Sequence, residues 1–299
     1  MEGGGRAMAG VQVGFSLNKP GWCSFQNPVP FLDFLASTGV GAVELPLAVS
    51  GEFDHAVAEA ALARGLVITF HLVWKREAVW KWYYGWNKGT GHADLEELLA
   101  TLDELAVRQG TPILVVIHPF DDGHDRERGL AITADLCRWL VERTRAQRCE
   151  VRWAIENMPH DPEAPSRPGD RLRELEELVT ETSELGICWD IGHWHLTREM
   201  DPHGGAPLTG RFVGRVIHTH VHDWAPGLGD HLPPGRGTVP FARALRILRQ
   251  AGYRGWLILE LDRDRALRFG PAQEVVRDAL AVIRRAWIEE AEGECSLFQ

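Results

Sequence analysis

The 299-residue sequence lacks the patterns that mark several large classes of protein. No apolar run approaches the roughly 18 residues of a membrane-spanning helix, so no membrane span is expected. The five cysteines are odd in number and scattered without a CxxC pair, which argues against a disulfide framework or a zinc-thiolate site. We therefore expect reduced thiols in a cytoplasmic protein.

Basic residues are also fewer than acidic residues, so the formal net charge is −10. This balance disfavours a broad nucleic-acid-binding surface, so a nucleic-acid partner is not expected. Residues 1–10 are rich in glycine and carry no apolar core of a signal peptide. We predict a disordered tail at residues 1–10, one folded domain at residues 11–291 and a short tail at residues 292–299.

A glycine-rich turn after an early strand is missing too, which disfavours an open, doubly wound sheet. Short apolar runs instead alternate with helical segments eight times along the chain, with no change of composition between the halves. This alternation is typical of a parallel sheet with helical crossovers. It predicts the α/β class and a single (β/α)8 TIM barrel, with the active site at the C-terminal ends of the strands.

Polar, metal-capable residues end five of the apolar runs, at intervals of 30 to 40 residues: His118, Glu156, Asp190, His220 and Glu260. The last four follow successive predicted strands, so we expect them to be neighbours at the rim of the barrel. Three carboxylates facing one centre repel one another unless a divalent cation neutralises them. The mixed oxygen and nitrogen set suits Mn²⁺, Mg²⁺, Co²⁺ or Zn²⁺. The alternative is structural, with carboxylates that cap helices or pair with arginine.

Three histidines, His218, His220 and His222, alternate on one predicted strand and therefore share one face. We expect His220 at the depth of the metal, His218 deeper in the core, and His222 with Asp223 nearer the mouth. His71 and His118 end two earlier strands. They could hold a second metal with Glu156 as a bridge, contact substrate, or serve structure alone.

Substrate-binding candidates lie in the predicted loops. His193, three residues after Asp190, is either a further ligand or a donor to a substrate oxygen. His231 and Arg236 lie in a turn-forming loop that could overhang the site. Residues 72–92 hold four of the 12 tryptophans. There Trp74 could stack on a sugar face, while the packing alternatives are a helix over the barrel or a subunit contact in a homo-oligomer.

These residues resemble the xylose isomerase-like TIM-barrel superfamily, which includes sugar isomerases and 3-epimerases, inosose dehydratase and endonuclease IV. The matching motifs are IENMP, WDIGH, HTHVHD, DHLPPGRG and ILELD. The resemblance implies one divalent metal, held by Glu156, Asp190, His220 and Glu260. It also implies that Glu156 and Glu260 exchange protons at carbon through an enediolate, while His193 orients a substrate oxygen.

We therefore expect a divalent-metal-dependent isomerase or epimerase of carbohydrate metabolism, acting on a small sugar or polyol-ketone. The alternatives are an inosose dehydratase-like lyase, an endonuclease IV-like phosphodiesterase and a barrel that only binds. The resemblance to endonuclease IV implies a three-zinc site with an Asp-x-His pair, whereas here Gly229 stands two residues before His231. The carboxylate of a third metal is thus missing or shifted.

Overall fold

Eight parallel strands close into a barrel in the computed structural model, which describes residues 11–24, 26–48, 52–73, 92–121, 123, 125–164, 166–201 and 208–289. Neighbouring strands follow chain order around the barrel, and the last strand pairs with the first. The strands are β1 (Val13–Ser16), β2 (Ala42–Ala48), β3 (Val67–Val73), β4 (Ile113–Ile117), β5 (Val151–Glu156), β6 (Gly186–Asp190), β7 (Val216–Val221) and β10 (Leu257–Leu259). The predicted (β/α)8 fold is confirmed. The tails predicted at residues 1–10 and 292–299, and Trp74, lie outside the described residues.

The strand register sets the polar strand ends at one level. Asp190 of β6 pairs with His220 of β7, and His220 pairs with Ile258 of β10, two residues before Glu260. The strands are buried on both faces, so their interior positions are almost all apolar. The C-terminal ends of β5, β6, β7 and β10 therefore meet at one end of the barrel.

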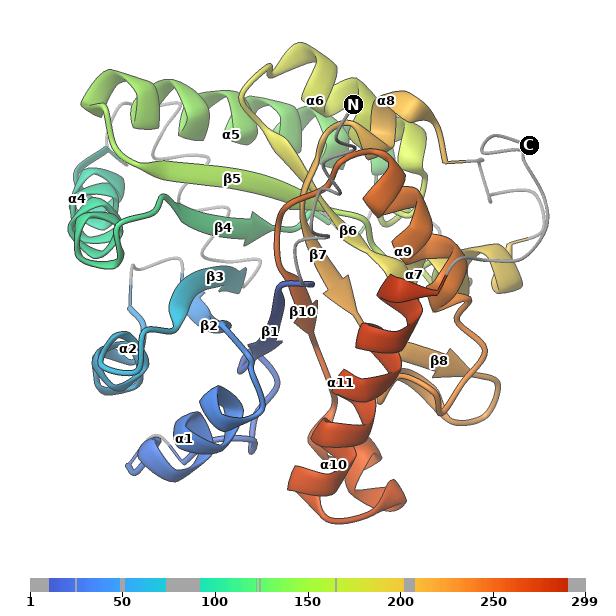
Figure 1. Cartoon of the computed structure of the whole chain (residues 1–299). Coiled ribbons are helices and arrows are strands. Elements are labelled where there is room, and N and C mark those ends of the chain that lie inside the picture. The colour runs from blue at the N-terminus through green and yellow to red at the C-terminus, as the bar shows by residue number, and fades with distance from the viewer. Residues whose placement is uncertain are drawn as a thin grey trace, which may run out of the picture.

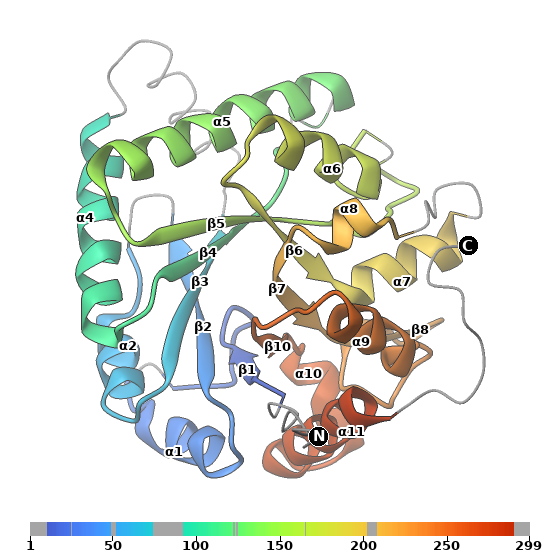
Figure 2. The same ribbon diagram turned by 45° about the horizontal axis from the view of Figure 1, so that its top comes forward.

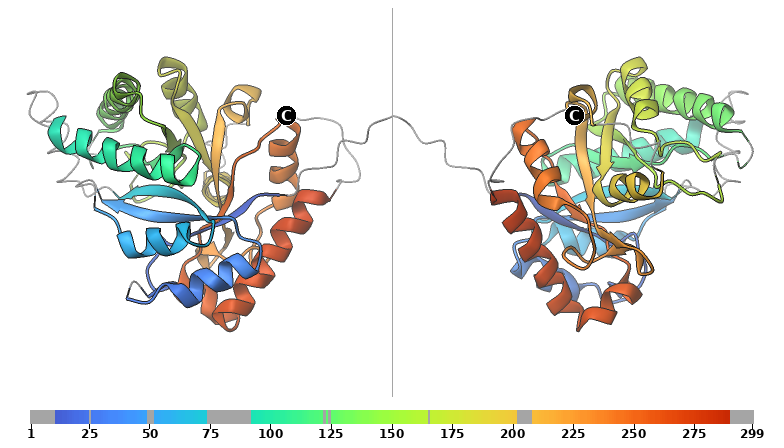
Figure 3. Two further views of the ribbon diagram at one scale, coloured as in Figure 1. Left: turned by 60° about the vertical axis from the view of Figure 1, so that its left-hand side comes forward. Right: turned by 90° about the vertical axis from the view of Figure 1, so that its right-hand side faces the viewer.

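Helices surround the strands, as Figure 2 shows. They are α1 (Val29–Ser37), α2 (His55–Leu62), α4 (His92–Gln109), α5 (Arg126–Gln147), α6 (Leu172–Glu181), α7 (Ile191–Met200), α8 (Gly210–Val213), α9 (Phe241–Gln250), α10 (Arg263–Ala266) and α11 (Ala272–Ile288). Helices α9 and α11 pack together on one side (Figures 1 and 3). Gly65 and Gly110 end two helices with positive φ, as their positions predict. None of the helices in the described ranges is long and apolar enough to cross a bilayer.

Two further features shape the surroundings of the site. Helix α7 runs for 10 residues directly from the end of β6. The reason is Asp190, whose carboxylate accepts the backbone N–H of His193 at 2.7 Å and caps the helix. The predicted loop after β7 contains an antiparallel pair, β8 (Asp223–Ala225) and β9 (Gly229–Leu232).

Candidate active site

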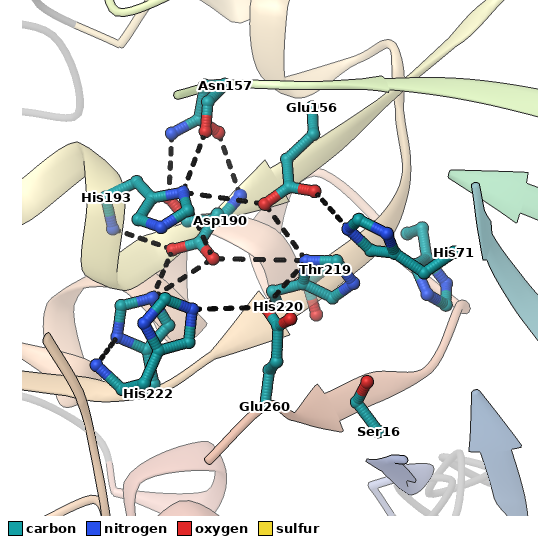
Figure 4. A network of polar contacts seen from close by, with 12 residues as sticks. Ser16, His71, Glu156, Asn157, Asp190, His193, Thr219, His220, His222 and Glu260 are labelled. Atoms are coloured by element: carbon teal, nitrogen blue, oxygen red, sulfur yellow. Dashed lines mark hydrogen bonds and ion pairs between the residues drawn. The ribbon is translucent and has the colours of Figure 1, made fainter. Parts of the chain in front are cut away.

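Four side chains from the C-terminal ends of β5, β6, β7 and β10 meet inside the barrel: Glu156, Asp190, His220 and Glu260. One potential ligand atom from each lies within 4.8 Å of the other three, and each side chain is at most 2% exposed. Figure 4 shows the ring of His220 between the carboxyl groups of Glu156 and Glu260. The structure thus brings together the four residues that the sequence analysis selected.

The orientation of His220 fits a metal ligand. Its Nε2 lies 3.1 Å from Glu44 Oε2 and donates a proton there, so Nδ1 is the nitrogen that could bind a metal once a cation has displaced its proton. Nδ1 is buried and has no hydrogen-bond partner among the described residues. It faces Glu156 Oε1 at 3.1 Å, Glu260 Oε2 at 3.4 Å and Asp190 Oδ2 at 3.9 Å. A divalent cation would satisfy this nitrogen and neutralise the carboxylates, so the donor set fits the metal.

Glu44 is a functional candidate that the sequence analysis missed. It lies on β2, is fully buried, and accepts hydrogen bonds from Ser16 Oγ at 3.0 Å and from His218 Nε2 at 3.0 Å besides His220. Burial raises its pKa, but His220 and His218 hold that pKa well below its usual range. A carboxylate that orients a metal-binding imidazole is a common partner in metal sites. The only sequence signal was an acid inside an otherwise apolar strand.

Glu156 directs its two oxygens to two different groups. Oε1 faces His220, whereas Oε2 lies 3.2 Å from His71 Nε2 and 3.1 Å from His118 Nε2. The two Nε2 atoms of His71 and His118 are 3.0 Å apart. His71, His118 and Glu156 therefore form a second cluster whose geometry could hold a cation, and Glu156 is common to both.

Asp190 is held from three sides. Besides capping α7, its carboxylate lies 3.1 Å from His222 Nε2, and its backbone N–H and C=O bond the side chain of Asn157 at 2.8 and 2.9 Å. His222 Nδ1 accepts the backbone N–H of His231 at 3.0 Å, so Nε2 carries the proton that Asp190 accepts. His222 directly follows the C-terminal end of β7 and is fully buried. Both ring nitrogens of His222 thus form hydrogen bonds, and the one from Nε2 positions the carboxylate of Asp190.

Glu260 is contacted by residues from the loop after β1. Its Oε1 accepts from Asn18 Nδ2 at 3.2 Å and lies 3.7 Å from Lys19 Nζ. Its Oε2, the oxygen nearer to His220, lies 3.5 Å from His231 Nε2. The sequence analysis did not select Asn18 or Lys19, because the pairing of residue 18 with residue 260 exists only after the barrel closes.

The predicted substrate-binding residues fall in different places. His193 Nδ1 lies 3.1 Å from the backbone oxygen of Asn157, 3.4 Å from Asp190 Oδ2 and 3.5 Å from Glu156 Oε1, so this nitrogen faces the cluster. His231 stacks on His222 with ring centroids 4.1 Å apart and thereby reaches the site. Arg236 does not join the cluster, because its guanidinium lies 3.3 Å from Asp278 and over the ring of Phe269.

The loop that carries His231 is organised by Asp223. This carboxylate is 1% exposed and accepts backbone N–H groups from Trp224, Gly235, Arg236, Gly237 and Val239 at 2.8 to 3.0 Å. Asp230, the acid shifted relative to the Asp-x-His pattern, is bound by Arg265. That ion pair holds the carboxylate of Asp230 at Arg265, so it is not free to act as a ligand of a third metal.

Neighbouring basic groups lower the pKa values of the buried acids. Burial raises the pKa of each of the three acids, but nearby basic groups lower it by more. His220 and His118 lower the pKa of Glu156, and His193 and His222 lower the pKa of Asp190. His220 and Lys19 lower the pKa of Glu260. All three pKa values end below their usual range. Burial lowers the pKa of His220, yet Cys188, Glu44 and Glu156 raise it well above the usual value. A bound cation would replace these protons as the counter-charge.

A closed parallel barrel with a buried cluster of carboxylates and histidines at its C-terminal end defines a TIM-barrel protein with a candidate metal centre. The profile of the xylose isomerase-like TIM-barrel family matches residues 32–286. The chain therefore belongs to that family.

Individual relatives are more distant. An L-ribulose-5-phosphate 3-epimerase, UlaE, from Escherichia coli O17:K52:H18 is 35% identical over 140 residues, which cover 44% of this chain and 43% of that protein. The chain thus matches less than half the length of this curated relative. The D-allulose 3-epimerase of Methylomonas sp., solved with D-allulose, shares 14% identity at a TM-score of 0.63 and covers 92% of this chain and 97% of its own. A family 2 AP endonuclease from Brucella melitensis has 15% identity, a TM-score of 0.52, and coverage of 84% and 93%. These structures show the shared fold.

Proposed function

We propose that the protein is a divalent-metal-dependent isomerase or epimerase that acts on a sugar or related polyol-ketone. The observation that carries this proposal is the convergence of Glu156, Asp190 and Glu260 on Nδ1 of His220, a buried nitrogen without a hydrogen-bond partner in the described part of the chain. Epimerases acting on ribulose 5-phosphate and allulose among the relatives support the substrate class.

Glu156, Asp190, His220 and Glu260 would hold the cation. When bound, the metal would polarise the carbonyl oxygen of the substrate and so acidify the neighbouring C–H bond. Glu156 and Glu260 stand on opposite sides of His220 (Figure 4), so they can address opposite faces of a bound substrate. One glutamate, as the carboxylate, would take the proton from carbon, and the C–H electron pair would become that of an enediolate. The other glutamate would have to enter the step protonated and would return its proton to carbon.

The surrounding residues prepare this exchange. Asn18 and Lys19 bind one oxygen of Glu260 and so fix the direction of its carboxylate. Asn157 and His222 fix Asp190, and Glu44 fixes the tautomer of His220. His193 Nδ1 lies 3.4 Å from Asp190 and His231 Nε2 lies 3.5 Å from Glu260, so both rings would contact substrate oxygens at the cluster. Glu156 and Glu260 are thus proposed as acid and base, and the remaining residues as positioning groups.

The second cluster supports a second candidate function. His71, His118 and Glu156 could hold a further metal ion next to the first, an arrangement that suits hydrolysis of a phosphodiester. Asp230 argues against a complete three-metal set, because Arg265 binds its carboxylate. We therefore place the phosphodiesterase second to the isomerase or epimerase. A dehydratase would begin with the same proton abstraction, but a hydroxyl group of the substrate would then leave as water instead of a proton being returned to carbon.

The proposal is tested by exchange of carbon-bound protons with D₂O, followed by NMR across ketoses and keto-inositols, with Mn²⁺, Mg²⁺, Co²⁺ or Zn²⁺ added. Exchange should depend on the metal and precede any particular product. Glu156→Gln and Glu260→Gln should each slow it by about 100-fold or more, since each removes an acid–base group.

Glu181→Gln, at an exposed position of α6, is the matched control and should keep full exchange. Full exchange in either active-site variant would remove that glutamate from the proton transfer. Cleavage of abasic DNA by a protein with three bound zinc ions, without any sugar exchange, would favour the phosphodiesterase instead.

A further inference from the structure

A cavity opens at the other end of the barrel from the candidate active site. It has a volume of about 620 Å³ and is lined by residues at the start of β5, β6 and β7 together with the end of α5 and the segment after α6. Figure 2 shows α5 and α6 side by side over these strands. A volume of several hundred Å³ is typical of pockets for small molecules.

Arginines dominate the polar lining of this cavity. Arg145, Arg148, Arg152 and Arg215 line it together with only two acids, Glu150 and Glu184. The lining therefore carries two positive charges in excess, on a chain whose net charge is −10. A positively charged lining on a negatively charged protein indicates an anion-binding site.

Two of the four arginines are already engaged by the protein. Arg145 bonds Glu184 at 2.6 Å, and Arg215 donates to the carbonyl oxygens of Ser183 and Leu185. Arg148 and Arg152 are exposed and have no ion pair or side-chain hydrogen bond within the described ranges. The engaged pair shapes the wall, and the other pair offers guanidinium donors to a ligand.

We infer that this cavity binds a phosphate monoester of a small organic molecule. Guanidinium groups bind phosphate oxygens through paired, charge-assisted hydrogen bonds. A phosphate monoester carries nearly two negative charges at neutral pH, which matches the excess charge of the lining. Val141, Val151 and Ile217 supply apolar wall for the organic part. The strands that begin at this cavity are β5, which ends at Glu156, β6, which ends at Asp190, and β7, which ends one residue after His220. The ligand would therefore lie at the opposite end of these strands from the candidate metal centre.

Phenyl phosphate is a suitable probe, because it carries the charge and a small apolar group but no sugar. Isothermal titration should show that it binds, and that phenol, which lacks the phosphate, does not. Arg148→Asn combined with Arg152→Gln should weaken binding by about tenfold or more, since it removes both unpaired guanidinium groups. Asn is chosen at residue 148 because Arg148 has φ 59° and Asn tolerates that backbone.

Cys149 provides an independent readout of location. It lines the cavity and is partly exposed, so phenyl phosphate should slow its alkylation when the labelled peptide is quantified by mass spectrometry. The control combines Arg138→Gln with Arg173→Gln, two exposed arginines on the outer faces of α5 and α6. It should leave binding and alkylation unchanged. Absence of binding, equal affinity in the Arg148 and Arg152 variant, or an unprotected Cys149 would each overturn the assignment.

Discussion

At the scale of single residues, Glu44 tests whether the metal ligand depends on its neighbour. Glu44→Gln would turn an amide toward the Nε2–H groups of His218 and His220 and remove the charge that orients them. Loss of such a partner weakens metal affinity by about 10- to 100-fold. Titration with Mn²⁺ or Zn²⁺ measures this change. Glu104→Gln on the exposed face of α4 is the control, and equal affinities would show that Glu44 serves packing alone.

Asp223 is a second residue whose role is local. Its carboxylate receives five backbone N–H groups from the loop after β7. Asp223→Asn replaces one acceptor oxygen by an NH2 group, which would face backbone N–H groups that are themselves donors. The loss of charge-assisted hydrogen bonds should lower the free energy of unfolding by about 2–3 kcal/mol. Urea unfolding measures it, with Asp264→Asn, at a 94% exposed side chain, as the control. An unchanged midpoint would contradict the anchoring role.

At the scale of elements, the start of α7 is packed against β7. A Cβ at Gly192 would lie 2.2 Å from His222 Cε1 and 2.3 Å from its Nδ1. Gly192→Ala improves helix propensity by about 1 kcal/mol, but the overlap should cost about 1–3 kcal/mol and displace His222 from Asp190. Both the unfolding free energy and the metal affinity should fall.

The double variant Gly192→Ala with His222→Ala separates packing from other causes. Removal of the ring removes the overlap, so the double variant should lose less stability than the sum of the single variants. Strictly additive losses, or no loss in Gly192→Ala, would show that the helix and strand accommodate the methyl group without strain.

At the scale of the whole molecule, stability should depend on metal and pH together. The pKa of His220 is raised in the folded protein, so its stabilising effect is complete below its unfolded pKa of 6.5 and is lost as pH rises through the folded value. The metal-free protein should therefore lose thermal stability as pH increases above 6.5, because the buried carboxylates lose their counter-charge.

Added divalent metal should remove this loss, since the cation replaces the protons. The rise in melting temperature on adding metal should consequently grow with pH. Scanning calorimetry with and without EDTA measures both curves. A metal-induced shift that is the same at pH 6 and pH 8 would contradict the exchange of protons for metal.

Much of the fold and the centre of the site could be predicted from the sequence. Apolar runs of strand length, each followed by a helical segment, dictated a parallel barrel. Because parallel strands share one C-terminal end, Glu156, Asp190, His220 and Glu260 had to meet once the barrel closed. The alternation of His218 and His220 along β7 likewise predicted that both side chains face the same side of the strand, and both contact Glu44.

Only the tertiary structure decided which distant groups complete the site. Glu44, Asn18 and Lys19 reach the cluster because β1 and β2 close the barrel beside β10, a contact that no local pattern encodes. Arg236 turned to α11, although its loop adjoins the site, because Asp278 offers a charge partner there. Sequence determines where polar groups stand along each strand, since that follows from local periodicity. Pairing across the barrel depends on closure and register, so it is fixed only when the whole chain is folded.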